Sequence, residues 1–413
     1  MSCLRPFRAV RPDPGKAHEV ASPPYDVLSS EEARLLAADS PNSFLHINKS
    51  EIDLPADTDL YADAVYARAR DNFKRMRADG IFIQDETPCL YIYTLEEGSH
   101  RQSGIAGCFS AQEYLDNHIR KHEHTRKDKE DDRTRHIDET SAQTGVVLLT
   151  YAHDAQVDAL IKKVMARPAL YDFTADDGIR HILHRIADTA EIDSLTASFK
   201  NINPLYIADG HHRSAGASIV YERRKAANPK HTGDEEYCFF LAVAFPDAEL
   251  QILPYNRVLV DLFGQSDAEF LKKLGEKFTI TPADHASPKE AKTICMYMGK
   301  ANGGWKLLRY TGALADDPLL RLDVAILQNE VLQPLLGITD PKKDKRIDFV
   351  GGTRGTQELE KLVDSGKFKV AFSMYPTQIS ELMAVAEANQ IMPPKSTWFA
   401  PKIRDGILVH VLE

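Results

Sequence analysis

The sequence predicts a mixed α and β fold, built as layers of sheet and helix in two or three lobes. Its 413 residues exceed what one ordinary hydrophobic core accommodates, since a domain usually takes about 100–200 residues. Hydrophobic residues make up 43% and charged residues 27% of the chain, the proportions of a folded globular protein. Segments with strand character alternate with segments of helical periodicity, which favours helices packed on a sheet.

The first residues of the chain are expected to be ordered and not to form a flexible tail. Ser29 or Ser30 can cap a helix that carries Glu31 and Glu32 in its first turn, where negative charge is favourable. Helical spacing is also expected over 59–78, 154–166 and 178–187, and strands over 89–94, 104–111 and 145–150.

In the second half, an apolar strand at 205–208 leads into a helix that continues to about residue 227. Further strands are expected at 238–245, 250–259, 293–299, 305–311, 346–350 and 368–374, and helices near 266–277, 320–335, 356–365 and 377–389. These elements predict three lobes, over 1–115, 116–262 and 263–413.

Charge and composition exclude several classes of protein. A net charge of −10 opposes nucleic-acid binding, which depends on many contacts from Lys and Arg to phosphates. No run approaches the roughly 18 apolar residues that span a bilayer, and five scattered cysteines form no Cys-x-x-Cys pair. We therefore expect a cytoplasmic protein with reduced thiols, no membrane and no nucleic-acid partner, and leave a homodimer open.

Residues 205–217 read LYIADGHHRSAGA, a strand, a tight turn and a helix start. Gly210 permits a positive φ, and the helix start directs unpaired N–H groups toward the turn. Such a helix end attracts phosphate, and the Arg213 guanidinium could add a bidentate contact to it. Asp209 could orient His211 or His212, hold Mg²⁺ or accept a proton from a hydroxyl. The alternative is an ordinary helix cap with two incidental histidines.

The stretch 118–136, HIRKHEHTRKDKEDDRTRH, is too polar for a core element and is expected to face water or ligand. Glu123, with His122 beside it, suits a carboxylate that accepts a proton, and Arg126 and Arg133 could meet phosphates. His118 and His122 would share one helix face, a geometry that can bind metal. The alternative is a solvated helix held by ion pairs such as Glu123 with Lys127.

Both ends of the chain offer ligand-binding chemistry. In PPYDVLS, Tyr25 could stack on a base and Asp26 adds a carboxylate, although the segment could equally pack a strand edge. In MPPKSTWFAPKIRDG, residues 392–406, Lys395 and Lys402 suit an anionic ligand, with a hairpin as the alternative. The Gly-rich turn at 350–355 is a weaker second anion site.

The DGHHR turn resembles that of the ParB and sulfiredoxin superfamily, where Gly-x-x-Arg at a helix start binds nucleotide phosphates and whose free L-serine kinases carry a closely similar turn. Over most of its length the chain resembles the bacterial family called domain of unknown function 1015. The matching segments are ASPPYDVLS, NSFLHINKSE, the HEHT and DR elements, DGHHR, LDVAILQNEVL and MPPKSTWFAPKIRDGILVH.

Residues and resemblance together predict a nucleotide-dependent phosphotransferase acting on a small hydroxylated metabolite, with Mg²⁺ and ATP or ADP as cofactors and L-serine as the implied acceptor. The expected catalytic residues are Glu123, Asp209, His211 and His212. The expected phosphate-binding residues are Gly210, Arg213, Ser214, Arg126, Arg133, Lys395 and Lys402, and the substrate-binding residues are Tyr25, Asp26 and His122. The alternatives are a ParB-like nucleotide-binding regulator and a phosphatase or other hydrolase.

Overall fold

The computed structural model describes residues 2–413, which form two compact units. Unit 1 contains the chain up to Leu250 together with Pro401–Glu413, and unit 2 is Gln251–Ala400. This division differs from the three predicted lobes. The main sheet of unit 1 takes strands from both sides of residue 115, because 100–110 pairs with 239–246, so the first two predicted lobes share one core.

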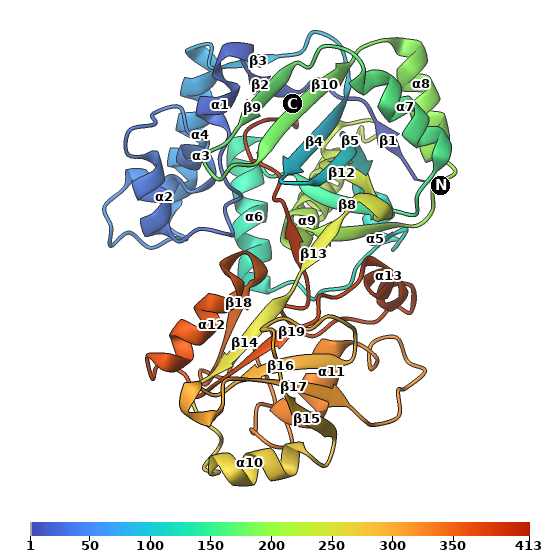
Figure 1. Ribbon diagram of the computed structural model, residues 1–413. Helices are drawn as coiled ribbons and strands as arrows, with labels where there is room; N and C mark the ends of the chain where they lie inside the picture. Colours follow the sequence, from blue (N-terminus) through green and yellow to red (C-terminus); the bar gives the residue numbers. More distant parts are fainter. Residues whose placement is uncertain (1) are drawn as a thin grey trace. The chain divides into compact units, whose positions relative to one another are not determined.

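A nine-stranded mixed sheet forms the centre of unit 1 (Figure 1). Its order is β6-β11-β8-β12-β5-β4-β10-β9, with β1 paired to β5. The strands are β1 (Leu4–Arg5), β4 (Leu90–Glu97), β5 (His100–Ser110), β6 (Ile119–Arg120), β8 (Val147–Tyr151), β9 (Tyr171–Thr174), β10 (Arg180–Ile186), β11 (Leu205–Asp209) and β12 (Phe239–Pro246). β11 runs antiparallel to β8, and β8 runs parallel to β12. The carboxyl end of β11 therefore lies beside the first residues of β8.

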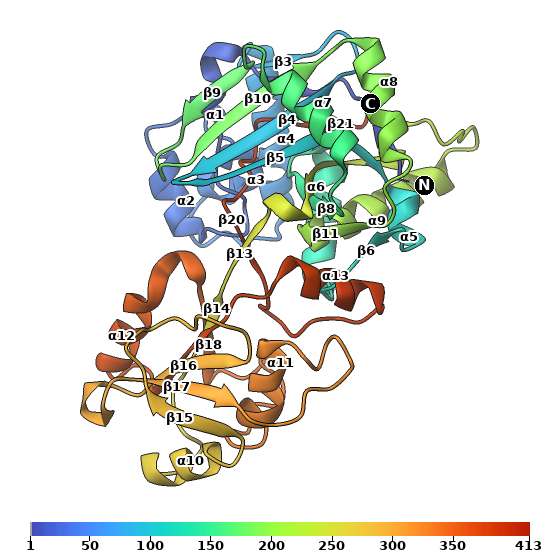
Figure 2. The same cartoon turned by 45° about the vertical axis from the view of Figure 1, so that its right-hand side comes forward.

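Helices cover both faces of this sheet. They are α1 (Ala17–Val20), α2 (Ser30–Ala37), α3 (Leu45–Asn48), α4 (Asp63–Ala78), α5 (Ala111–Leu115), α6 (Lys127–Thr140), α7 (Ala155–Met165), α8 (Thr189–Phe199) and α9 (His211–Ala227). α9 packs on β8, β12 and α6, whereas α7 packs on β4, β5 and β10. In Figure 2, α7 and α8 lie in front of the sheet and α4 and α6 behind it. The predicted cap of α2 is confirmed, since Ser29 and Glu32 form a reciprocal capping box.

Short pairings tie the last residues of the chain to its first ones. β2 (Val10–Pro12) pairs with β3 (Phe82–Gln84), and β7 (Ala142–Gln143) pairs with β21 (His410–Val411). Ser22 and Asp405 exchange two backbone hydrogen bonds, of 3.1 and 2.9 Å. The PPYD and KIRD segments, nearly 400 residues apart in sequence, are therefore neighbours. The hairpin considered as the alternative for residues 392–406, with KIRDG as its turn, does not form, because the strands on the two sides of KIRDG pair with other partners.

Unit 2 is built on a six-stranded antiparallel sheet of order β15-β17-β16-β19-β14-β18. Its strands are β14 (Tyr255–Leu259), β15 (Phe278–Pro282), β16 (Thr293–Tyr297), β17 (Trp305–Tyr310), β18 (Ile347–Gly351) and β19 (Val370–Met374), and β13 (Gln251–Leu253) pairs with β20 (Trp398–Ala400). Its helices are α10 (Asp267–Leu274), α11 (Asp323–Leu327), α12 (Gly355–Asp364) and α13 (Ile379–Glu387). A core of its own, containing Val258, Tyr297 and Leu359, stabilises this unit.

Two predicted helices are wrong. The segment 178–187 contains β10, because its Ile and Leu side chains are buried in a seven-residue ladder with β4, and the helix follows only after Asp188 caps α8. The stretch 118–126 forms β6 and a loop, so His118 and His122 share no helix face. The helix that does follow, α6, is not simply solvated: it buries Asp132, Thr134 and His136. The mixed α/β class, with several sheets, is confirmed.

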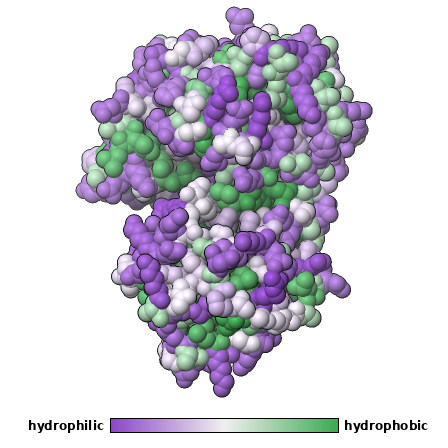
Figure 3. Space-filling view, in the orientation of Figure 1, coloured by the Kyte–Doolittle hydropathy of each residue, from purple (hydrophilic) through white to green (hydrophobic). Residues whose placement is uncertain are grey.

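No helix in the described part of the chain is long and apolar enough to cross a bilayer. Hydrophilic side chains cover most of the face shown in Figure 3, with smaller apolar patches between them.

Candidate functional site

The turn between β11 and α9 has the predicted strand, glycine and helix order. Gly210 adopts φ +95°, a left-handed conformation that costs a residue with a Cβ. A bulge between Ile207 and Asp209 alters the register of β11 just before the turn. The N–H groups of Arg213 and Ser214 donate to the Gly210 carbonyl, so α9 begins directly at His211. The first N–H groups of the helix therefore face the turn.

Asp209 and Lys402 form an ion pair at this turn, with Nζ and Oδ2 2.7 Å apart. The other carboxylate oxygen accepts from the N–H of Gly210 at 2.9 Å. Burial raises the pKa of the Asp209 carboxyl, but Lys402 and Arg213 lower it more, and the net pKa lies well below its ordinary value. Asp209 is therefore a weak base that holds Lys402 in place.

The histidines connect the turn to the loop after β6. The His122 and His211 rings meet edge to face with centroids 4.4 Å apart, and His211 Nδ1 lies 4.0 Å from Glu123 Oε2. His212 Nε2 accepts from the N–H of Arg126 at 3.1 Å. Burial, and then the neighbouring His122, lowers the pKa of His211 well below its usual value, while burial lowers that of His122 to about 4. Both rings are neutral at pH 7, which suits positioning more than acid catalysis.

Glu123 retains access to solvent, with 41% of its side chain exposed. His211 Nε2 accepts the N–H of His122 at 3.5 Å, so the neutral ring carries its proton on Nδ1, the atom that faces Glu123. The Glu123 carboxylate therefore lies beside a hydrogen-bond donor. Glu123 and His122 therefore lie beside the turn.

Arg213 occupies a different position from the one its motif predicted. Its side chain is 8% exposed, and its guanidinium donates a hydrogen bond to the Val146 carbonyl. The Arg213 Nε packs so closely against Gly210 that a Cβ at position 210 would lie only 2.9 Å from it. The guanidinium therefore lies beneath the turn instead of projecting from an open helix start. Burial lowers the pKa of Arg213, but Asp26, Asp209 and Asp405 raise it further, so it stays charged.

A cavity of about 20 Å³, room for about one water molecule, lies next to Arg213 and is also lined by Tyr25 and Arg133. The Arg133 guanidinium sits 4.0 Å from the centre of the Tyr25 ring and pairs with Asp132 at 2.8 Å. Only 11% of the Arg133 side chain is exposed. Arg133 is therefore mostly buried and contacts the Tyr25 ring, instead of lying at the surface.

Asp405 and Asn48 belong to this buried cluster and were not among the predicted site residues. Asn48 Nδ2 donates to Asp405 Oδ2 at 2.5 Å, and Asp405 is fully buried. Burial raises the pKa of Asp405 to about 7, against the opposing effect of Arg213. One feature of the sequence could have identified Asp405: it is the carboxylate in KIRDG, three residues after the candidate phosphate-binding residue Lys402.

The remaining predicted residues have other partners. Ser214 is buried and its hydroxyl donates to the backbone carbonyl of His211, and Arg126 pairs with Asp128 at the surface. Asp26 is exposed and acts electrostatically on His212 and Arg213. Lys395 belongs to unit 2, with its ammonium 5.3 Å from the centre of the Tyr255 ring.

Mg²⁺ takes oxygen ligands, usually one or two carboxylates together with phosphates. Both oxygens of Asp209, the carboxylate considered for this ion, are engaged by Lys402 and the Gly210 N–H. These residues do not form a Mg²⁺ site by themselves.

A model of the family described as "Protein of unknown function (DUF1015)" matches residues 4–325, which contain PPYD, the HEHT loop and the DGHHR turn. The search among curated proteins gave no match.

Three solved structures show a distant likeness, each at 13% identity. A conserved hypothetical protein from Pyrococcus furiosus covers 75% of this chain and 95% of its own, with a TM-score of 0.34. A mutant free serine kinase in complex with AMP covers 74% and 92%, with a TM-score of 0.35. SbnI with a C-terminal truncation, from Staphylococcus aureus, covers 72% and 82%, with a TM-score of 0.38.

Proposed function

The chain belongs to the DUF1015 family, and from the site in unit 1 we propose that it is a nucleotide-dependent phosphotransferase that phosphorylates the hydroxyl of a small polar metabolite. One observation carries the proposal: the Lys402 ammonium, the first N–H groups of α9 and the Glu123 carboxylate meet at one turn. The first two attract phosphate and the third can accept a proton.

The helix start and Lys402 receive the terminal phosphates of ATP or ADP. Lys402 is 22% exposed and is held by Asp209, so it can turn its charge to a phosphate without leaving the turn. Arg213 keeps the turn electropositive from beneath, a different role from the direct clamp expected from its motif. In this arrangement the protein positions the reactants and offsets negative charge, which is most of what phosphoryl transfer requires.

Glu123 accepts the proton of the acceptor hydroxyl as its oxygen bonds to the terminal phosphorus and the bond to the leaving nucleotide breaks. Asp209, the other predicted base, is less suited because its pKa is held far below its usual value. His211 and His122 position Glu123. L-serine as the acceptor, Mg²⁺ on the nucleotide and the ParB-like character of the turn remain predictions from the sequence resemblance.

The test combines phosphorus NMR with calorimetric titration of ATP and ADP. Wild-type protein with nucleotide and a pool of amino and hydroxy acids, L-serine included, should form a new phosphoester. Glu123→Gln should bind nucleotide nearly as wild type but lose roughly 10²–10⁴-fold in turnover. Lys402→Met should weaken nucleotide binding by roughly ten- to a hundredfold, the effect of one charge-assisted contact.

The surface variant Glu139→Gln serves as the control and should behave as wild type. Nucleotide binding without turnover in any acceptor pool would favour the nucleotide-binding regulator. Nucleotide hydrolysis that needs no acceptor and survives Glu123→Gln would favour a hydrolase, and unchanged binding in Lys402→Met would remove the turn from phosphate recognition.

A further inference from the structure

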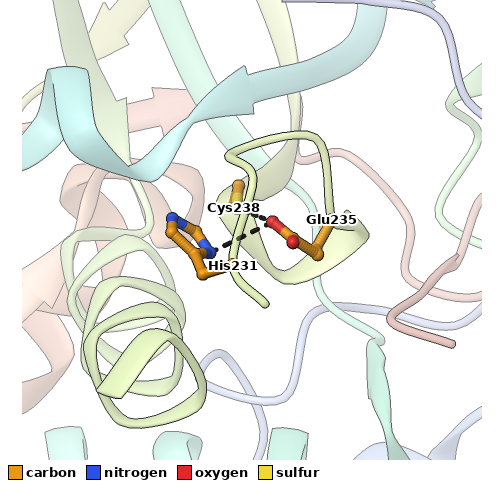
Figure 4. A group of neighbouring side chains, drawn as sticks. All are labelled: His231, Glu235 and Cys238. Atoms are coloured by element: carbon orange, nitrogen blue, oxygen red, sulfur yellow. Dashed lines mark hydrogen bonds and ion pairs between the residues drawn. The ribbon is translucent and has the colours of Figure 1, made fainter. Parts of the chain in front are cut away.

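The loop that joins α9 to β12 brings together three side chains that can each bind a metal ion (Figure 4). His231 Nδ1 lies 3.1 Å from Glu235 Oε2, and Cys238 Sγ lies 3.5 Å from the same oxygen. The three donor atoms all lie within 4.8 Å of one another. They come from only eight consecutive residues, and they take no part in the site at the DGHHR turn.

These distances match the edges of a tetrahedral zinc site. With Zn–N and Zn–O bonds of about 2.1 Å and a Zn–S bond of about 2.3 Å, the N···O edge is about 3.4 Å and the S···O edge about 3.6 Å. The observed N···O and S···O separations differ from these values by a few tenths of an ångström. The N···S pair lies within 4.8 Å, where the tetrahedral edge is about 3.6 Å, so one ion could contact all three atoms after a modest adjustment of the side chains.

The Glu235 carboxylate is already oriented by its surroundings. It accepts from the N–H groups of Thr232 and Gly233 at 2.7 and 2.9 Å, and from the Thr232 hydroxyl at 3.1 Å. Burial opposes its charge, but hydrogen bonds from backbone N–H groups, those of Thr232 and Gly233 among them, together lower the pKa of Glu235 to about 2. Outer hydrogen bonds of this kind fix the ligands of known metal sites.

The His231 ring is held by Tyr237, which stacks on it at 5.9 Å with 24° between the planes. The Tyr237 hydroxyl also lies 3.1 Å from His231 Nδ1 and accepts from Asn228 at 2.9 Å. An ion on Nδ1 would replace the hydrogen bond between His231 Nδ1 and the Tyr237 hydroxyl and leave the stacking in place. The imidazole is thus supported in the orientation that the ion needs.

We propose that His231, Glu235 and Cys238 form a binding site for Zn²⁺ or a similar divalent transition-metal ion, with water as the fourth ligand. Sulfur and nitrogen donors select this class of ion over Mg²⁺ and Ca²⁺, which take oxygen ligands. On binding, the Cys238 thiol gives its proton to solvent and its sulfur bonds to the metal, Glu235 is already anionic, and neutral His231 supplies a lone pair. The ion fixes the connection between α9 and β12.

The test uses the full chain, first stripped with a chelator and then titrated with CoCl₂ and ZnCl₂. Wild-type protein should bind one Co²⁺ with a thiolate-to-metal charge-transfer absorption, which Zn²⁺ displaces, and should release about one proton per ion to the buffer. Cys238→Ser keeps a hydrogen-bonding group near Glu235 but should abolish the thiolate absorption. His231→Gln should weaken binding by more than the roughly 10–100-fold cost of losing an outer partner.

Cys295→Ser is the matched control, because Cys295 is another buried thiol, 3.7 Å from the Nδ1 of His285, and it should leave binding unchanged. Circular dichroism of the metal-free variants checks their folding, and His231→Gln tests the site even if Cys238→Ser fails to fold. Absence of the thiolate absorption in wild type, or Zn²⁺ binding unaffected by His231→Gln, would overturn the proposal.

Discussion

At the scale of single residues, the chemistry of the site in unit 1 depends on which charges are buried. Arg213, Asp209 and Asp405 all lie within one electrostatically coupled cluster. Attraction between buried opposite charges stabilises the fold only while each charge has a partner, because an unpaired buried charge strongly destabilises the folded state. Substitutions in this cluster should therefore change stability as well as binding.

Arg213→Ala should destabilise the protein by about 3–5 kcal/mol, because it removes the buried positive charge that faces Asp26, Asp209 and Asp405 and leaves Asp209 to its ion pair with Lys402. An arginine at an open helix start would have little packing to lose, but Arg213 is buried. Urea denaturation followed by circular dichroism measures the effect. Arg126→Ala is the control: its side chain is 62% exposed, and surface ion pairs contribute about 0–1 kcal/mol. Equal unfolding midpoints for the two variants would contradict the buried position of Arg213.

Asp405 should make stability depend on pH. Its pKa is raised to about 7 in the folded chain, above the value of about 3.9 expected when unfolded, so the folded state holds a proton that the unfolded state has lost. Stability should therefore fall as pH rises from about 4 to 7, by up to about 1.4 kcal/mol per pH unit. The neighbours that act on this carboxyl are Arg213, Asp26, Asn48 and Arg133.

Asp405→Asn keeps the shape of the side chain and should remove this part of the pH dependence. Unfolding free energies measured at pH 5 and pH 8 should converge in the variant relative to wild type. If the difference in unfolding free energy between pH 5 and pH 8 is the same in wild type and in Asp405→Asn, another group causes the pH dependence.

At the scale of elements, the site depends on the close packing of α6 against α9. A Cβ on Gly216 would meet the Arg133 Cβ and the Thr134 backbone N at 3.1 Å. Gly216 therefore allows α9 to approach the helix that carries Arg133, just as Gly210 allows the turn that starts α9. Small residues in DGHHRSAGA thus serve the packing as well as the anion-binding turn.

Gly216→Val should lower stability by about 1–3 kcal/mol, the usual effect of overpacking a tight interface. Replacing glycine by valine in a helix gains only a few tenths of a kcal/mol in helix propensity, so the steric effect dominates. Ala226→Val adds bulk on the exposed side of α9 and should cost about 0.6 kcal/mol. Thermal unfolding of both variants decides the question, and a Gly216→Val protein as stable as wild type would show that the helices have room to separate.

At the scale of the whole molecule, unit 2 is an insertion into unit 1. The chain leaves unit 1 after Leu250 and returns at Pro401, and Gln251 pairs directly with Ala400 across two antiparallel strands. Paired residues in such strands have Cα atoms about 5 Å apart. A short linker can therefore span the gap if unit 2 is removed.

Replacing residues 251–400 by a Gly-Gly linker should leave unit 1 folded, and on the proposed function it should still bind nucleotide, because Lys402, Glu123 and the α9 turn all belong to unit 1. Residues 251–400 expressed alone should fold on their own sheet and core. Circular dichroism and calorimetric titration of both fragments test this. A shortened unit 1 that unfolds, while the full chain unfolds in one cooperative step, would show that the two units form one thermodynamic domain.

Local signals in the sequence determined a large part of this protein. Hydrophobic periodicity, capping residues and glycine placed the β11 turn, the start of α9 and the capping box of α2, because these depend on neighbours within a few residues. The same local reasoning selected Glu123 and Asp209 as candidate catalytic residues and Lys402 as a candidate phosphate-binding residue. It failed at 178–187, where the ladder with β4 overrides helical spacing.

Only the tertiary structure decided which of these groups meet and which charges are buried. The Ser22–Asp405 bridge brings KIRD beside PPYD, and this long-range pairing leaves no periodic trace in either segment. Folding also decided which charges are accessible: Arg213 and Arg133 are buried, while Lys402 keeps part of its side chain exposed at the turn. The same motif letters can serve as ligand or as scaffold, because solvent exposure is a property of the folded chain and not of the segment.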